Sequence, residues 1–125
     1  MAKISNDEAI GRLMMVLAMH VGEENAIDMG ELYEKVFDTE YRNKINDTKR
    51  LRNLITHLRK QKHIPIGSTC KTDGGGYYLI RAGSELSEHC DRLHRRALGI
   101  LSMEAGFRKI SMPELLGQMS LRLKT

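Results

Sequence analysis

The chain has 125 residues, of which 41% are hydrophobic and 29% charged, and its formal net charge is +4. This length suffices for one domain, or for a small domain with an appendage, whereas two full domains would each be marginal. The balance of apolar and charged residues is typical of a globular protein and argues against wholesale disorder. With no Trp and only two Phe, the core is expected to be aliphatic and Met-rich.

Hydropathy and cysteine usage favour a cytoplasmic protein without a membrane partner. No apolar run approaches the roughly 18 residues that a membrane-spanning helix needs, and the N-terminus leads into a charged helix pattern rather than an apolar signal segment. Cys70 and Cys90 lack CxxC spacing, which indicates reduced thiols.

The charges are unevenly distributed along the chain. Between Arg42 and Lys71, nine bases stand against the single acid Asp47, whereas between Glu23 and Glu40 seven acids stand against Lys35. We therefore expect the folded protein to have a basic side and an acidic side.

Two amphipathic helices are expected first. One spans about residues 7–20, with Ser5 or Asn6 as its cap and Gly22 as its end. Its apolar stripe consists of Ile10, Leu13, Met14, Leu17 and Val21. Asp28 is the expected cap of a second, shorter helix. The apolar residues of that helix are Met29, Leu32, Tyr33, Val36 and Phe37. Residues 38–46 show no clear periodicity and are expected to form a loop, with a helical turn as the alternative.

A third helix is basic and ends near Lys62, because Pro65 disfavours helical structure at Ile64. Its buried stripe is Leu51, Leu54, Ile55 and Leu58, at i, i+3, i+4 and i+7. The opposite face carries Lys49, Asn53, Thr56 and Lys60, flanked by Arg50, Arg52, His57 and Arg59. Such a carboxylate-free face suits phosphates and base edges. A solvated helix face is the alternative interpretation of the charge pattern alone.

A β-hairpin is expected after the basic helix. Ile64 to Thr69 predicts one strand, residues 72–76 a glycine-rich turn, and Tyr77 to Arg81 the returning strand. The turn lacks the Lys-Ser/Thr ending of a nucleotide-binding loop, which argues against a nucleotide site.

Two further helices are expected at the C-terminus. Gly83 and Ser84 open a long helix whose apolar residues follow the 4-3-4-3-4 spacing of a short coiled coil. These residues are Leu86, Cys90, Leu93, Ala97 and Ile100, followed by Glu104. Either this seam forms a homodimer or the helix packs on its own domain. Residues 111–114 match a capping box, and Leu115, Leu116, Met119 and Leu123 mark a terminal amphipathic helix. We expect one domain over residues 1–82 and a helical extension over 83–125, for dimerisation or for covering the core.

Two stretches resemble a known family of DNA-binding domains. The run from Arg50 to Arg59, with His63-Ile64-Pro65-Ile66 and Gly76-Tyr77-Tyr78-Leu79 after it, is similar to the third helix and wing of bacterial winged helix-turn-helix domains. The likeness is to the biotin-repressor-like type and to small phage and mobile-element proteins, and it covers about residues 9–81. His63 stands where that family usually has glycine, and the connector at 38–46 is longer than the family's short turn. The expected fold class is mainly α with a small β-hairpin (α+β), a winged helix-turn-helix with one long and one short C-terminal helix.

The resemblance implies that the basic helix enters the major groove of double-stranded DNA while the wing touches the backbone or minor groove. Carried onto this sequence, the groove-side candidates are Lys49, Arg50, Asn53, Thr56, His57 and Lys60. The residues expected nearer phosphates are Arg52, Arg59 and Lys62 in the helix, and Thr69, Lys71 and Thr72 in the wing. The implied function is that of a small phage or mobile-element transcriptional regulator, or of a replication or recombination accessory factor. The alternative is a module that binds host proteins through the same surface, without DNA.

No catalytic constellation can be assembled from the sequence. His89 and His94 lie about 140° apart on a helix and miss the i, i+4 spacing of two metal ligands on one face. A zinc site would also need Cys70 or His63, and Cys90 is expected to be a small core residue. We therefore expect no enzyme activity, no catalytic residue, no metal and no cofactor.

Overall fold

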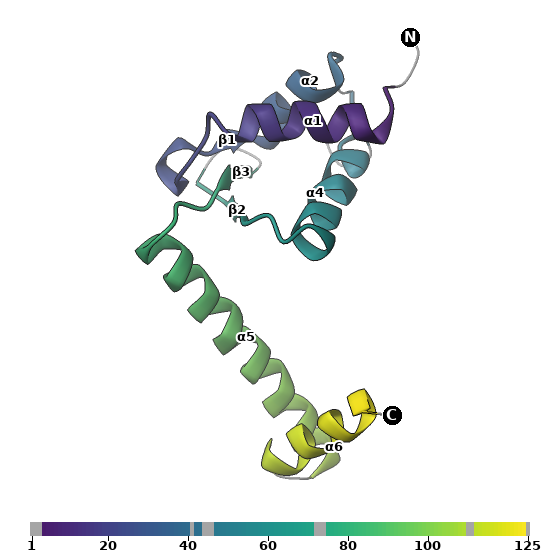
Figure 1. Ribbon diagram of the computed structural model, residues 1–125, viewed down its shortest axis with the longest axis vertical. Helices are drawn as coiled ribbons and strands as arrows, with labels where there is room; N and C mark the ends of the chain where they lie inside the picture. The colour runs from purple at the N-terminus through teal and green to yellow at the C-terminus, as the bar shows by residue number, and fades with distance from the viewer. Residues whose placement is uncertain (1–3, 41, 44–46, 72–74, 110–111, 125) are drawn as a thin grey trace. The chain divides into compact units, whose positions relative to one another are not determined.

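The computed structural model describes residues 4–40, 42–43, 47–71, 75–109 and 112–124, without the side chains of 121–124. The protein is mainly helical and has one small three-stranded antiparallel sheet (Figure 1). It divides into two compact units, Met1–Leu86 and Ser87–Thr125. None of the helices in the described ranges combines the length and the apolar character that crossing a bilayer requires.

Helix α1 (Asn6–Leu17) begins at a capped N-terminus, where the Ser5 Oγ accepts a hydrogen bond from the Glu8 N–H at 3.1 Å. It ends before the predicted His20, because the backbone groups of His20 and Gly22 form hydrogen bonds with Leu79 instead of continuing the helix. The Leu79 N–H donates to the His20 carbonyl at 2.9 Å, and the Gly22 N–H donates to the Leu79 carbonyl at 2.8 Å. Gly22 has a φ of 90°, a conformation that glycine adopts at little cost.

The next segment contains a short 3-10 turn, η1 (Glu23–Asn25), the strand β1 (Ile27–Asp28) and the helix α2 (Met29–Phe37). Asp28 caps α2 as predicted, since its Oδ2 accepts from the backbone N–H groups of Gly30 and Glu31 at 3.0 and 3.3 Å. These bonds satisfy donors that have no partner inside the helix. The helix ends at Asp38 in a left-handed conformation.

The basic helix α4 (Lys49–Gln61) ends one residue before the predicted Lys62. All four residues of its predicted apolar stripe, Leu51, Leu54, Ile55 and Leu58, are buried. The Leu58 carbonyl accepts from the N–H groups of both Lys62 and Ile64. Between them, His63 has a φ of 56°. Such a left-handed residue commonly ends a helix and is most easily supplied by glycine.

The sheet consists of β1, β3 (Gly76–Leu79) and β2 (Ile66–Thr69), in the order β1-β3-β2. In the register, Ile66 pairs with Leu79, and Ile27 of β1 pairs with Tyr77. The prediction of a two-stranded hairpin is therefore incomplete. The third strand is only two residues long, too short to show a period. Of the predicted turn at 72–76, residues 72–74 lie outside the described residues.

The core of the first unit is aliphatic, as predicted, but it is not Met-rich. Among the described residues, no Met belongs to the buried set, and Met14 and Met29 only pack against its edge, while Met15 and Met19 are exposed. The helical phase explains the exposure of Met15, which falls off the stripe of α1, whereas Met19 lies beyond the end of that helix. The core cluster is Ala9, Leu13, Leu17, Ile27, Leu32, Val36, Leu51, Leu54, Ile55, Leu58 and Ile66, and Tyr78 and Ile80 are buried as well.

The second unit contains most of α5 (Ser84–Arg108) and all of α6 (Met112–Lys124). Figure 1 shows α6 folding back beside the C-terminal turns of α5. Of the residues described in this unit, only Ala105 and Leu115 are buried. Cys90 is exposed, so its predicted place in a core is wrong. The predicted start of the last capping box, Ser111, lies outside the described residues.

Replacing Leu51 by Ala should lower the free energy of unfolding by about 2–5 kcal/mol, because a fully buried leucine leaves a cavity when it is truncated. Urea unfolding followed by circular dichroism measures this, since the chain has no Trp. Met15→Ala is the matched control on an exposed site and should change stability by no more than about 0.5 kcal/mol. Equal effects of the two changes would contradict the assigned core.

Candidate nucleic-acid interface

The outward face of α4 is polar and contains no acid. Lys49, Asn53, Thr56, His57 and Lys60 are exposed, and α4 contains neither Asp nor Glu. This placement follows from the helical period, because the buried leucine and isoleucine positions fix which residues point outward. The Thr56 Oγ1 donates back to the Arg52 carbonyl at 3.0 Å, which leaves the hydroxyl oxygen available as an acceptor. The face therefore offers ammonium, amide and imidazole groups together.

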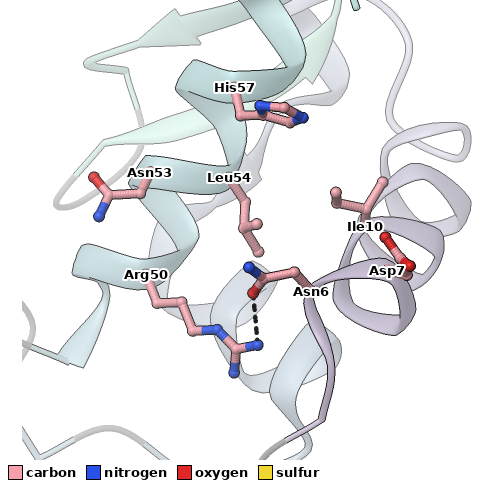
Figure 2. Close-up of a pocket in the computed structure, with 7 residues that line it drawn as sticks. All are labelled: Asn6, Asp7, Ile10, Arg50, Asn53, Leu54 and His57. Carbon is pink, nitrogen blue, oxygen red and sulfur yellow. Dashed lines mark hydrogen bonds between the residues drawn. The ribbon is translucent and has the colours of Figure 1, made fainter. Parts of the chain in front are cut away.

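Arg50, one of the predicted groove-side residues, is engaged within the chain. Its Nη2 donates to the Ile4 carbonyl at 2.6 Å. The same nitrogen donates to Asn6 Oδ1 at 2.9 Å, as Figure 2 shows. Its guanidinium also lies 5.0 Å from the ring centroid of Phe37, at the end of α2. A planar guanidinium can make all of these contacts at once. Arg50 thus joins the beginning of α4 to α1 and α2.

Arg59 has the same role near the other end of α4. Its Nε donates to the Ile66 carbonyl at 2.8 Å and its Nη2 to Ser68 Oγ at 2.7 Å, and the guanidinium lies 5.8 Å from the Tyr77 ring centroid. Burial lowers the pKa of Arg59 from its ordinary value, while the neighbouring tyrosines oppose this shift. Arg59 therefore ties α4 to β2. Arg52 is partly buried, and Lys62 is exposed just after the helix.

The DNA-binding candidates predicted in the wing are less accessible to a ligand than those on α4. Thr69 is buried, and its Oγ1 accepts from the Lys71 N–H at 3.2 Å. The Lys71 ammonium is exposed but forms an ion pair with Glu23, and this hydrogen bond raises the pKa of Lys71. A phosphate would have to displace Glu23, at small cost because exposed ion pairs are weak. Thr72 lies outside the described residues.

A groove of about 510 Å³ lies between the beginning of α1 and α4. Figure 2 shows Asn53 and His57 projecting from α4, with Asp7 and Ile10 on α1. The groove is lined by Asn6, Asp7, Ile10, Arg50, Asn53, Leu54 and His57. Asn6 and Asp7 were not predicted at this site, because only the tertiary packing of α1 beside α4, including the Arg50–Asn6 hydrogen bond, brings them there.

Asp47, the one acid between Arg42 and Lys71, forms hydrogen bonds within the connector before α4. The Asp47 Oδ2 accepts from the N–H groups of Arg42 and Asn43 at 2.7 and 3.0 Å. These backbone hydrogen bonds lower the pKa of Asp47. The rest of the connector, at 41 and 44–46, lies outside the described residues.

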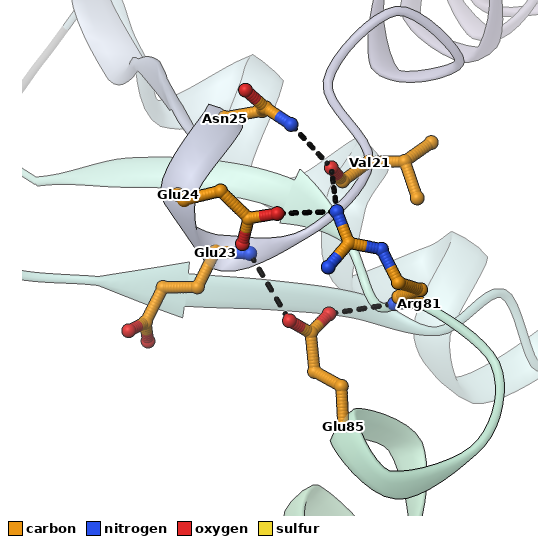
Figure 3. A network of polar contacts seen from close by, with 6 residues as sticks. All are labelled: Val21, Glu23, Glu24, Asn25, Arg81 and Glu85. Carbon is orange, nitrogen blue, oxygen red and sulfur yellow. Dashed lines mark hydrogen bonds and ion pairs between the residues drawn. The ribbon is translucent and has the colours of Figure 1, made fainter.

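Part of the predicted acidic side is neutralised by a polar network (Figure 3). The Arg81 guanidinium pairs with Glu24 and reaches the Val21 carbonyl at 3.4 Å. The hydrogen bond from Arg81 lowers the pKa of Glu24. Glu85 accepts from the N–H groups of Arg81 and Glu23 at 2.6 and 3.3 Å. The first turn of α5 is thereby tied to the first unit.

The described residues contain no group of three His, Cys, Asp or Glu side chains that could hold a metal ion. Comparison of the chain with models of protein families, with curated proteins and with solved structures found no match.

Replacing Arg50 by Ala should lower the free energy of unfolding by about 1–3 kcal/mol, because it removes hydrogen bonds from a charged donor and leaves their acceptors without that partner. Lys49→Ala removes the same charge from the neighbouring, exposed position and should leave stability nearly unchanged. Urea midpoints measured for the two variants test the assignment. Similar midpoints would mean that Arg50 does not hold α4.

Acid should weaken the first unit through Glu24 and Asp47. Their pKa values lie below the ordinary 4.5 and 3.8 in the folded protein, so each stabilises the fold fully above those values. That stability is lost as the pH falls through the lowered pKa values. Thermal midpoints between pH 7 and pH 2 should therefore fall less steeply for Glu24→Gln/Asp47→Asn than for the wild type. Glu34→Gln, on an exposed acid of α2, should keep the wild-type slope.

Proposed function

We propose that this protein binds double-stranded DNA as a winged-helix domain, with the outward face of α4 in the major groove and the β2–β3 strands near the backbone. The observation that carries the proposal is the exposed, acid-free face of a helix whose opposite face is buried. A cationic face without carboxylates retains favourable Coulomb interactions with a polyanion. The resemblance of residues 50–59 and 63–79 to winged-helix sequences supports the same function.

The contacts divide the candidate DNA-binding residues of α4 into two groups. Lys49, Asn53, His57 and Lys60 are the groove-side residues, because their side chains are exposed on the outward face. Asn53 can pair bidentately with adenine, and a lysine can contact guanine or a phosphate. Arg50 and Arg59 instead orient the helix, since their donors bond to α1 and β2. This division narrows the set of candidates that the sequence suggests.

The biological role within this proposal rests on the resemblance alone. It is that of a cytoplasmic phage or mobile-element protein, acting in transcription regulation or as a replication or recombination accessory factor. Selection of duplexes from a random pool distinguishes a sequence reader from a shape binder, because only a sequence reader enriches a consensus.

The triple variant Lys49→Ala/Asn53→Ala/Lys60→Ala should lose retention of duplex DNA in a gel-shift assay while keeping the wild-type unfolding curve. The matched control is Arg92→Ala/Arg95→Ala, which removes two exposed positive charges from α5 and should retain the duplex. In the wild type, the logarithm of affinity should fall with the logarithm of salt concentration by about 0.9 per phosphate contacted. Loss of two lysine–phosphate contacts should reduce the magnitude of this slope by about 2.

Two outcomes would contradict the proposal. If the triple variant binds like the wild type, α4 is not the contact surface. If the wild type retains no duplex of any sequence at low salt, DNA is not the partner, and the host-protein module becomes the better interpretation of this face.

A further inference from the structure

Helix α5 carries an apolar stripe that its own unit does not cover. Leu93, Ile100, Met103 and Phe107 are 50%, 59%, 57% and 79% exposed. Leu93, Ile100 and Phe107 are spaced by seven residues, so they drift by only about 20° per step around the helix. This exposed apolar stripe consists of Leu93, Ala97, Ile100, Met103 and Phe107.

The buried residue of α5 lies on a different side of the helix. Ala105, the buried residue of α5, is five positions from Ile100 and therefore about 140° away around the helix. The exposed apolar stripe is thus separate from the side of α5 that carries the buried residue.

The second unit buries few of its own side chains, since Ala105 and Leu115 are its buried residues among those the structure describes. It runs only from Ser87 to Thr125, and chains of fewer than about 40 residues usually need disulfides, metals or oligomerisation. Cys90 is a free thiol in this unit. Covering four large side chains would remove roughly 100 Å² of apolar surface each. A symmetric pair would therefore bury roughly 800 Å² before its flanking residues are added, and these residues must supply the rest of the about 1,000 Å² that a specific interface should exceed.

We infer that the exposed apolar stripe pairs with the same stripe of a second copy of this chain, as an antiparallel two-helix contact with Ile100 near the two-fold axis. The 4-3-4-3-4-3 spacing from Leu86 to Phe107 is the pattern of a helix that packs against a like helix. When a surface patch binds the same patch of a second copy, the assembly is also complete as a dimer and adds no further subunits. This inference does not rest on DNA binding.

Charge decides the relative direction of the two helices. Glu104 is the one acid in the seam and forms an ion pair with Arg108 at 2.9 Å in its own chain. In a parallel pair, the two Glu104 side chains would face each other as like charges. In an antiparallel pair centred on Ile100, Glu104 faces Arg96 of the other copy, Met103 faces Ala97, and Leu93 faces Phe107. The antiparallel arrangement therefore avoids the repulsion and places large side chains against each other.

Sedimentation of the whole chain at concentrations up to about 100 μM, a range in which a micromolar dissociation constant gives mostly dimer, should give twice the 14.2 kDa chain mass. Ile100→Glu/Phe107→Glu should give the monomer mass with unchanged helix content. The matched control, Met15→Glu/Met19→Glu, places two charges at exposed methionines of the first unit and should remain dimeric. A monomeric wild type would overturn the inference, as would a dimer that persists in Ile100→Glu/Phe107→Glu.

Cross-linking tests the direction even if the glutamate variant fails to fold. In a Cys70→Ser/Cys90→Ser background, a chain with Leu93→Cys is mixed with a chain carrying Phe107→Cys and oxidised. The antiparallel pair should give mainly disulfides between the two kinds of chain. Mainly Leu93→Cys chains linked to each other would overturn the antiparallel arrangement, and no linked chains would overturn the contact itself.

Discussion

Four aliphatic side chains on one face of α4 are buried against the core, and their burial fixes which side of the helix meets the solvent. The helical period then places Lys49, Asn53 and Lys60 outward. Turning the helix by one residue, about 100°, would replace leucines in the core with the guanidinium groups beside them, at a cost of several kcal/mol for an unpaired buried charge. The candidate interface is therefore a direct consequence of how this one helix packs.

The two arginines near the ends of α4 show why a count of charges overstates the free positive surface. Arg50 bonds to the beginning of α1, and Arg59 bonds to β2. The same holds for negative charge, since Glu24 pairs with Arg81 and Glu23 with Lys71. The basic and acidic stretches are each partly neutralised inside the first unit. The outward face of α4 therefore offers fewer positive groups to a partner than the count of charges suggests.

The predictions from sequence succeeded where a local pattern determines the structure. The bounds of α2, its Asp28 cap and the buried stripe of α4 follow from side-chain spacing and capping chemistry within a few residues. The early end of α1 was not predictable, because it depends on hydrogen bonds between His20, Gly22 and Leu79. The partners of Arg50 are likewise 44 and 46 residues away. A two-residue strand such as β1 has no period to detect. Long-range contacts thus account for most of what the sequence left out.

Helices α4 and α5 carry the same kind of apolar repeat but meet different surroundings. In α4 the repeat lies in a core built by α1, α2 and the sheet, so its burial is complete within the chain. In α5 the exposed apolar stripe has no such core in its unit, and exposed apolar surface costs about 25 cal/mol per Å². A regular repeat gains free energy only when another surface matches its spacing. The two units therefore differ in what they expose: the first presents a cationic polar face on α4, and the second an apolar face on α5.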